Sequence, residues 1–168
     1  ALALAAVGRV KREICVPALF LALLGDLFLL VEGGPWFMAG LAAFLGAHLA
    51  YIDGFLAGGV HIDLLLGTLG LTAAVSFAVG GRILMALRSR GRPAMIAAVV
   101  PYMLAISVMV ALAGATANPA AIAGAVLFYI SDAMIAWNRF VEPLPSARLP
   151  IIVTYQVGQA LLVVSLAL

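Results

Sequence analysis

The stretch LFYISDAMIAWNRF, Leu127 to Phe140, indicates the fold class. It belongs to an otherwise apolar run, and one acidic side chain, Asp132, lies inside that run. The run begins near Pro119 and extends for about 20 residues, the length that a helix needs to cross ~30 Å of hydrocarbon. A charged Asp at the centre of a bilayer costs roughly 2.5 to 3.5 kcal/mol on insertion scales. Such an acid needs a partner or a polar cavity, and we therefore expect it to have a function.

The rest of the chain has the same character. Of its 168 residues, 66% are hydrophobic and only 10% are charged, far from the balance of a soluble domain. The apolar residues form several continuous segments of about 17 to 20 residues, whereas transmembrane strands would show short alternating runs. The sequence predicts an all-α protein, a polytopic transmembrane helical bundle, in a single domain over residues 1–168.

Loop residues and apolar lengths place the predicted helices. Six full helices are expected, at Ile14–Val31, Trp36–Ile52, Ile62–Gly80, Ala94–Ala113, Pro119–Asn138 and Pro150–Leu168. Residues 1–8 are interpreted as the end of a preceding helix, and residues 1–13 together as a remnant of that helix and a basic loop.

The basic residues lie in clusters between the apolar segments, which is typical of a topology signal and not of a nucleic-acid interface. Two loops that should lie on the same, cytoplasmic side carry Arg82, Arg88, Arg90, Arg92, Arg139 and Arg148. The opposite side carries Arg9, Lys11 and Arg12. We expect an integral multi-pass protein of a bacterial inner membrane, with membrane lipids around it and no nucleic-acid partner.

The depth of each polar side chain can be counted from the end of its helix. Asp26 should lie ~8 Å and Asp132 ~9 Å from the same side of the membrane, so the two carboxyl groups share a level. Tyr155 and Gln159 enter from that side too, at roughly 8 and 14 Å. These four residues are predicted to line one polar pocket.

Two further polar residues, His48 and Tyr51, are three positions apart and therefore share a helix face. The count places them nearer the opposite side of the membrane, with Tyr102 close to mid-depth. They form either the deeper wall of the same pocket or a separate hydrogen-bonded cluster. For Tyr102 and Ser131, a hydrogen bond between helices is the simpler interpretation.

Two other kinds of site are weaker interpretations. Asp26, Asp132 and His48 are suitable metal ligands in type, but no HExxH or Cys cluster accompanies them, and the count places His48 too far along its helix. A Ser131, His48, Asp132 triad lacks the GxSxG turn around the serine, and adjacent residues on a helix point in different directions. No metal is predicted.

Four segments resemble, in order and spacing, the YhhN family of membrane proteins, which includes the lysoplasmalogenases. They are LLGDLFLL around Asp26, FLGAHLAY around His48 and Tyr51, LFYISDAMIAWNRF around Asp132, and YQVGQALLV around Tyr155 and Gln159. The resemblance implies an eight-helix membrane protein that hydrolyses the vinyl-ether bond of lysoplasmalogens to a fatty aldehyde and a glycerophospho-amine. Asp26 and Asp132 match the acidic positions proposed to be catalytic in that family.

This chemistry suits two carboxyl groups. A vinyl ether is cleaved by protonation of its alkene carbon, and water captures the resulting oxocarbenium ion, so an acid and a negative stabiliser are both needed. We expect one Asp to be protonated and the other ionised, with no cofactor. Residues expected to contact a lysophospholipid or ether-lipid substrate are His48, Tyr51, Tyr102, Ser131, Asn138, Tyr155 and Gln159.

Two other classes of function use the same residues differently. In a lipid or small-molecule transporter, the intramembrane acids would relay protons or bind a head group. In a structural membrane subunit, they would have no chemical role. The sequence does not indicate an oligomeric state.

Overall fold

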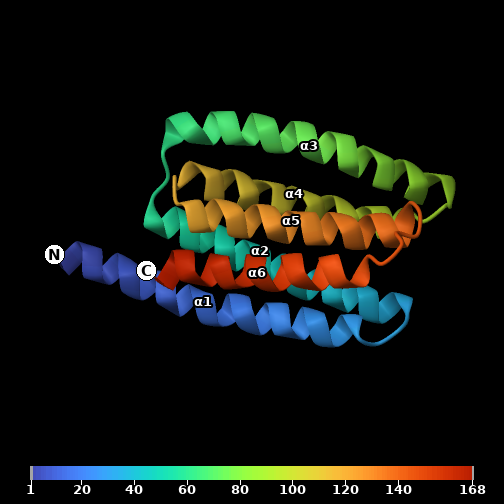
Figure 1. Cartoon of the computed structure of the whole chain (residues 1–168), viewed down its shortest axis with the longest axis horizontal. Helices are drawn as coiled ribbons and strands as arrows, with labels where there is room; N and C mark the ends of the chain where they lie inside the picture. The colour runs from blue at the N-terminus through green and yellow to red at the C-terminus, as the bar shows by residue number, and fades with distance from the viewer. Residues whose placement is uncertain (1, 168) are drawn as a thin grey trace.

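A computed structural model describes the backbone of residues 2–167 and the side chains of residues 13–167. The described chain is all-helical, as predicted, and Figure 1 shows its helices lying lengthwise beside one another. The helices are α1 (Leu2–Leu29), α2 (Gly34–Gly58), α3 (Ile62–Ser89), α4 (Pro93–Ala115), α5 (Pro119–Phe140) and α6 (Arg148–Ala167).

The order of packing follows the short connections, because consecutive helices run in opposite directions and form hairpins. The helices α1 and α2, α3 and α4, and α5 and α6 pack in pairs, and α2 also packs on α4 near the middle of the bundle. Within the described residues, α3 contacts only α4 and α5, so it forms one edge of the molecule (Figure 1).

Three predicted boundaries are wrong. The helix α2 continues six residues beyond the predicted end at Ile52, because Tyr51 and Phe55, one turn apart, are buried on one face of its last turns. The other two wrong boundaries lie next to basic residues. The helix α1 is continuous from Leu2, so the loop predicted within residues 9–13 is not observed; the side chains of residues 1–12 lie outside the description. The helix α3 extends nine residues beyond the predicted end at Gly80, because Ile83 and Leu87, one turn apart, bury one face of its last turns. Charged residues end an apolar segment without ending an amphipathic helix.

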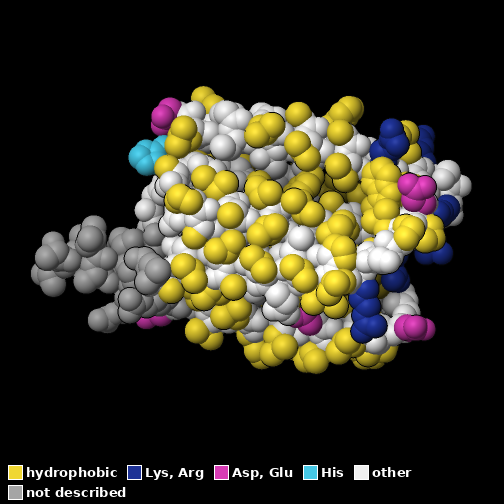
Figure 2. All heavy atoms as spheres, viewed as in Figure 1, with side chains coloured by type: hydrophobic (Ala, Val, Ile, Leu, Met, Phe, Trp, Pro, Cys, Tyr) yellow, Lys and Arg dark blue, Asp and Glu magenta, His cyan; other side chains and the backbone are white. Residues whose placement is uncertain are grey.

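The molecule is an integral, multi-pass membrane protein. Among the described residues, the five helices α2 to α6 are long and apolar enough to cross a membrane. The helix α1 packs along α2 beside them. Figure 2 shows hydrophobic side chains over the flank, while the described Arg side chains gather at the end where the α1–α2, α3–α4 and α5–α6 connections lie. We refer to this as the basic end, and the count of crossings predicted it.

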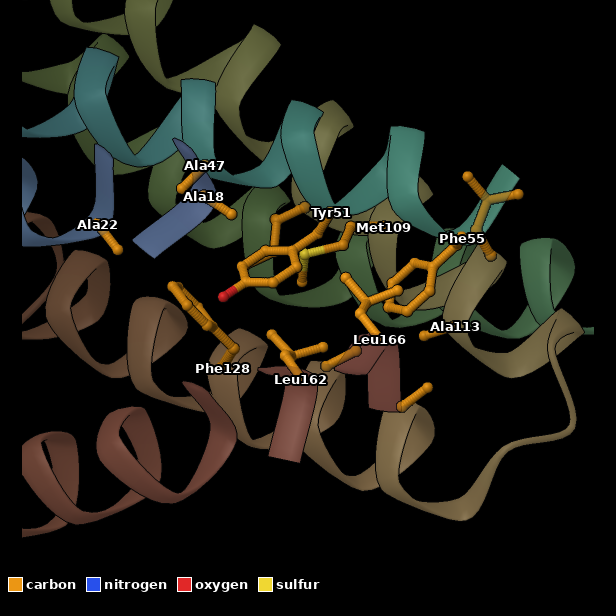
Figure 3. Packing of buried hydrophobic residues seen from close by; sticks show 14 of the residues in the cluster. Ala18, Ala22, Ala47, Tyr51, Phe55, Met109, Ala113, Phe128, Leu162 and Leu166 are labelled. Atoms are coloured by element: carbon orange, nitrogen blue, oxygen red, sulfur yellow. The ribbon is translucent and has the colours of Figure 1, made fainter. Parts of the chain in front are cut away.

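The core lies between α2, α4, α5 and α6. Tyr51, Phe55, Phe128, Met109 and Leu162 are all almost fully buried, and Figure 3 shows them converging between these helices.

The two last helices approach each other closely at glycines. A Cβ atom on Gly124 of α5 would stand 2.9 Å from the carbonyl oxygen of Gly158 of α6 and 2.8 Å from the amide nitrogen of Leu162. Small residues of this kind let membrane helices pack backbone to backbone. This contact fixes α6 beside the part of α5 that carries Asp132.

Candidate active site

Asp132 lies at the centre of a cluster of three side chains from three helices. The hydroxyl of Tyr102, on α4, donates a short hydrogen bond to Oδ2 of Asp132. The Nε2 atom of His48, on α2, lies 3.3 Å from the same oxygen and 3.1 Å from the Tyr102 hydroxyl. The cluster therefore ties α2, α4 and α5 together at the acid.

The hydrogen-bond pattern fixes the proton on the imidazole ring. The Tyr102 hydroxyl uses its hydrogen in the bond that it donates to Asp132. Both oxygens next to His48 Nε2 can therefore only accept a hydrogen bond from it, and Nε2 must carry the hydrogen. The other ring nitrogen, Nδ1, is buried and has no hydrogen-bond partner among the described residues. His48 thus acts as a donor to the carboxyl group, and Oδ2 receives two donors.

The position of His48 corrects an argument made from depth. Counting residues placed it nearer the opposite side of the membrane and too far along its helix to meet Asp132, but the two side chains are in contact. Side chains lean toward the N-terminus of their helix. Because α2 starts at the basic end and α5 ends there, His48 and Asp132 lean toward each other, which closes a Cα offset of roughly 9 Å.

Asp26 is held in a second, separate pair. The Tyr155 hydroxyl, on α6, donates to Oδ2 of Asp26, on α1, at 2.8 Å. The carboxyl groups of Asp26 and Asp132 are near enough to interact electrostatically. Both acids therefore accept a tyrosine hydroxyl, and each tyrosine comes from a different helix.

Aromatic rings separate the two pairs. Phe128 makes edge contacts with His48, at 5.0 Å between ring centroids, and with Tyr155, at 5.3 Å. Phe44 lies against both Phe128 and Tyr155. The predicted pocket shared by Asp26, Asp132, Tyr155 and Gln159 is thus divided by a layer of rings.

A small apolar cavity of about 70 Å³ adjoins Asp132. Asp132 and Tyr102 supply polar groups to its lining, whereas Asp26 and Tyr155 are not part of it. The other lining residues come from α1 to α5 and are apolar except for Tyr129. Asp132 is therefore the acid that lines a small apolar space.

A larger groove of about 570 Å³ lies between α3, α4 and α5. It shares Val79, Tyr129 and Ala133 with the lining of the cavity, so the two spaces are neighbours. Its other lining residues are apolar apart from Thr72, and many, such as Leu71 and Val126, are exposed on the flank of the bundle. The groove provides an apolar route from the flank toward Asp132.

The remaining predicted site residues make contacts elsewhere. The Tyr51 hydroxyl donates to Oε1 of Gln159 at 3.1 Å, so His48 and Tyr51, although on one face, belong to different clusters. Ser131 points away from its neighbour Asp132 and donates to the carbonyl of Ile151 on α6. Asn138 is exposed, and its Oδ1 accepts the amide of Leu144 at 2.8 Å.

The aromatic residues that shape the site are not among the residues predicted from the sequence. Phe37 and Phe44 line the cavity from α2, and Phe140 lines it from α5. A usable signal was present, because Phe37, Phe44, His48 and Tyr51 recur at helical spacing and so lie on one face of α2. The prediction included the polar residues of that face, His48 and Tyr51, but not its phenylalanines.

Comparison with known proteins supports a common family. The family model described as the YhhN family matches residues 1–166. Lysoplasmalogenase TMEM86B of Sus scrofa is 36% identical over 135 residues, which cover 78% of this chain and 54% of that protein. TMEM86B of Homo sapiens is 33% identical over 143 residues, covering 77% and 53%.

A bacterial relative is similar over more of the chain. The lysoplasmalogenase of Mycobacterium tuberculosis is 33% identical over 159 residues, which cover 93% of this chain and 60% of that protein. The chain thus spans about half the length of the curated relatives that it matches. No solved structure matches it.

Proposed function

The chain belongs to the YhhN family, and on this premise we propose that it is a membrane-embedded hydrolase of lysoplasmalogen-type lysophospholipids. The bond cleaved is the vinyl ether, and the products are a fatty aldehyde and a glycerophospho-amine. Relatives from mammals and from Mycobacterium carry the name lysoplasmalogenase. The expected location is the cytoplasmic membrane of a bacterium.

One observation carries the proposal. A carboxyl group lines an apolar cavity inside a membrane bundle, and one of its two oxygens has no hydrogen-bond partner among the described residues. Both donors, from Tyr102 and His48, bind Oδ2 of Asp132, and Oδ1 has no hydrogen-bond partner among the described residues. A protonated carboxyl keeps an acceptor oxygen and gains one O–H donor. Oδ1 is therefore the atom from which a proton can be delivered into the cavity.

The proposed reaction consists of protonation, addition of water and breakdown of a hemiacetal. Asp132 Oδ1 gives its proton to the alkene carbon next to the alkyl chain, and the positive charge moves to the carbon bonded to the ether oxygen. Water adds to that carbon and returns a proton to the Asp132 carboxylate, which now acts as a base. The resulting hemiacetal breaks its bond to the glycerol oxygen, which takes a proton and leaves as an alcohol, and the aldehyde remains.

Asp26 has a supporting electrostatic role in this proposal. Its carboxylate lies across the aromatic layer from the cavity and interacts with Asp132 through space. A negative charge fixed in a water-poor site stabilises a cation more strongly than it would in water. Tyr155 holds this charge in place, so no rearrangement is needed when the oxocarbenium ion forms.

The geometry also accommodates the rest of a single-chain lipid. The groove between α3, α4 and α5 can receive the alkyl chain, since it is apolar, adjoins the cavity and reaches the flank of the bundle. Its volume of about 570 Å³ lies within the usual range of small-molecule sites. The substrate would enter from the bilayer with its head group at the basic end.

The test uses the protein purified in detergent and two lysophospholipids that differ only in the bond beside the oxygen. The vinyl ether should release fatty aldehyde, and the saturated ether should not, because it has no alkene carbon to protonate. In D₂O the aldehyde should carry one deuterium on the carbon next to the carbonyl.

Two results would overturn the proposal. Equal release from both ethers would show that alkene protonation is not the chemical step. Absence of aldehyde, together with lipid movement across sealed vesicles that contain the protein, would favour transport.

A further inference from the structure

Arg139, near the end of α5 at the basic end, is exposed and lies against a residue that lines the cavity, Phe37. Its guanidinium carbon lies 4.0 Å from the centre of the Phe37 ring, a cation–π contact. Phe37 lines the cavity and packs edge-on against Phe140, which lines it too. The charge of Arg139 is thus held over an aromatic wall of the space that Asp132 adjoins.

No described residue forms an ion pair with Arg139 or with its neighbour Arg92. Arg92, immediately before α4, lies close enough to Arg139 for the two charges to interact. Neither guanidinium makes a hydrogen bond or an ion pair with another described residue. The nearby acid, Glu142, accepts a hydrogen bond from the Trp137 indole. Two positive charges that interact with each other favour the binding of an anion.

The spacing between acid and arginine fits one class of ligand. Asp132 and Arg139 are seven residues apart on α5, so they share a helix face and are separated by a rise of about 10 Å. In a vinyl-ether lysophospholipid, seven bonds join the carbon to be protonated to the phosphorus, a span of roughly 8 Å in an extended chain. A substrate with its alkene at Asp132 would therefore place its phosphate at the level of Arg139.

We propose that Arg139, assisted by Arg92, binds the phosphate of the lysophospholipid head group and so makes the site select phosphate-bearing ethers over neutral ones. This inference rests on the proposed function for the position of the alkene. A guanidinium offers paired donors that match phosphate oxygens. The basic end is then more than a determinant of topology, because two of its arginines belong to the substrate site.

The experiment compares two vinyl ethers with the same alkyl chain: the lysophospholipid and the corresponding alkenyl glycerol, which lacks the phosphate. The ratio of their kcat/KM values measures selection for phosphate. Arg139→Gln should lower this ratio by about tenfold or more, since hydrogen bonds to a charged group are lost, and adding Arg92→Gln should lower it further. Arg148, at the start of α6 at the same end, has no cation–π contact with a cavity residue among the described residues, so Arg148→Gln is the matched control and should leave the ratio unchanged.

An unchanged ratio in the Arg139→Gln, Arg92→Gln double variant would overturn the inference. An equal loss in Arg148→Gln would also overturn it, because general surface charge would then account for the effect. If the wild type cleaves neither substrate, binding of the saturated-ether lysophospholipid decides. Weaker binding by the double variant than by wild type and Arg148→Gln would sustain the phosphate site although the proposed function had failed, and equal binding would refute it.

Discussion

The replacement Tyr102→Phe tests the arrangement around Asp132 with the least disturbance of packing. It keeps the buried ring in the lining of the cavity and removes only the hydroxyl that donates to Oδ2. His48 then remains as the single donor to the acid. We expect the carboxyl group to lose its fixed orientation toward the cavity.

The size of the effect follows from the bond that is lost. A hydrogen bond to an ionisable buried group contributes about 1.5 to 3 kcal/mol, and each 1.36 kcal/mol corresponds to a tenfold change in rate. The value of kcat for aldehyde release should therefore fall about 10- to 150-fold, while KM changes little because the apolar surface is kept. The assay is aldehyde formation from a vinyl-ether lysophospholipid by the purified protein.

The matched control is Tyr129→Phe. Tyr129 also lines the cavity, but its hydroxyl bonds to Ser76 at 3.0 Å and does not touch Asp132. Its kcat should stay close to that of the wild type. Wild-type kcat in Tyr102→Phe, or an equal fall in both variants, would refute the positioning role that we assign to Tyr102.

Three further predictions concern stability and the second acid. Gly124→Ala should lower the thermal unfolding midpoint in detergent, at a cost of about 1–3 kcal/mol, because the new Cβ meets the backbone of α6; Gly70→Ala, with nothing nearby, is its control. Asn118→Ala should cost about 1 kcal/mol, since its Oδ1 caps the amides that begin α5; an unchanged midpoint would contradict this. Asp26→Asn should keep the Tyr155 hydrogen bond and the unfolding midpoint but lower kcat about 10²-fold; full turnover would exclude an electrostatic role for Asp26.

Much of the architecture was accessible from sequence because it depends on length and hydropathy. The all-helical bundle and the basic end follow from counting apolar segments and crossings. The end of α3 was missed since its last turns are amphipathic, with Ile83 and Leu87 inside and the arginines outside. Hydropathy reports the lipid-facing length of a helix and not its full length.

The partners of the site residues were less predictable, because they depend on which helices are neighbours. The number of residues from a helix end gives the depth of a side chain in the membrane, but it does not say which neighbouring helix the side chain faces. It therefore does not predict that Asp26 pairs with Tyr155 and Asp132 with Tyr102. It also ignored the lean of side chains along their helices, which brings His48 to Asp132. Of the two phenylalanines between the pairs, Phe44 shares a face of α2 with His48 and Tyr51, whereas Phe128 lies on α5.

The most direct measurement of the central claim is aldehyde release by Asp132→Asn beside Asp63→Asn. Both changes remove one carboxyl group of the same type, and Asp63 is exposed in the first turn of α3, away from the basic end and the cavity. We expect Asp132→Asn to be folded and inactive, and Asp63→Asn to turn over like the wild type. Undiminished aldehyde release by Asp132→Asn would contradict it.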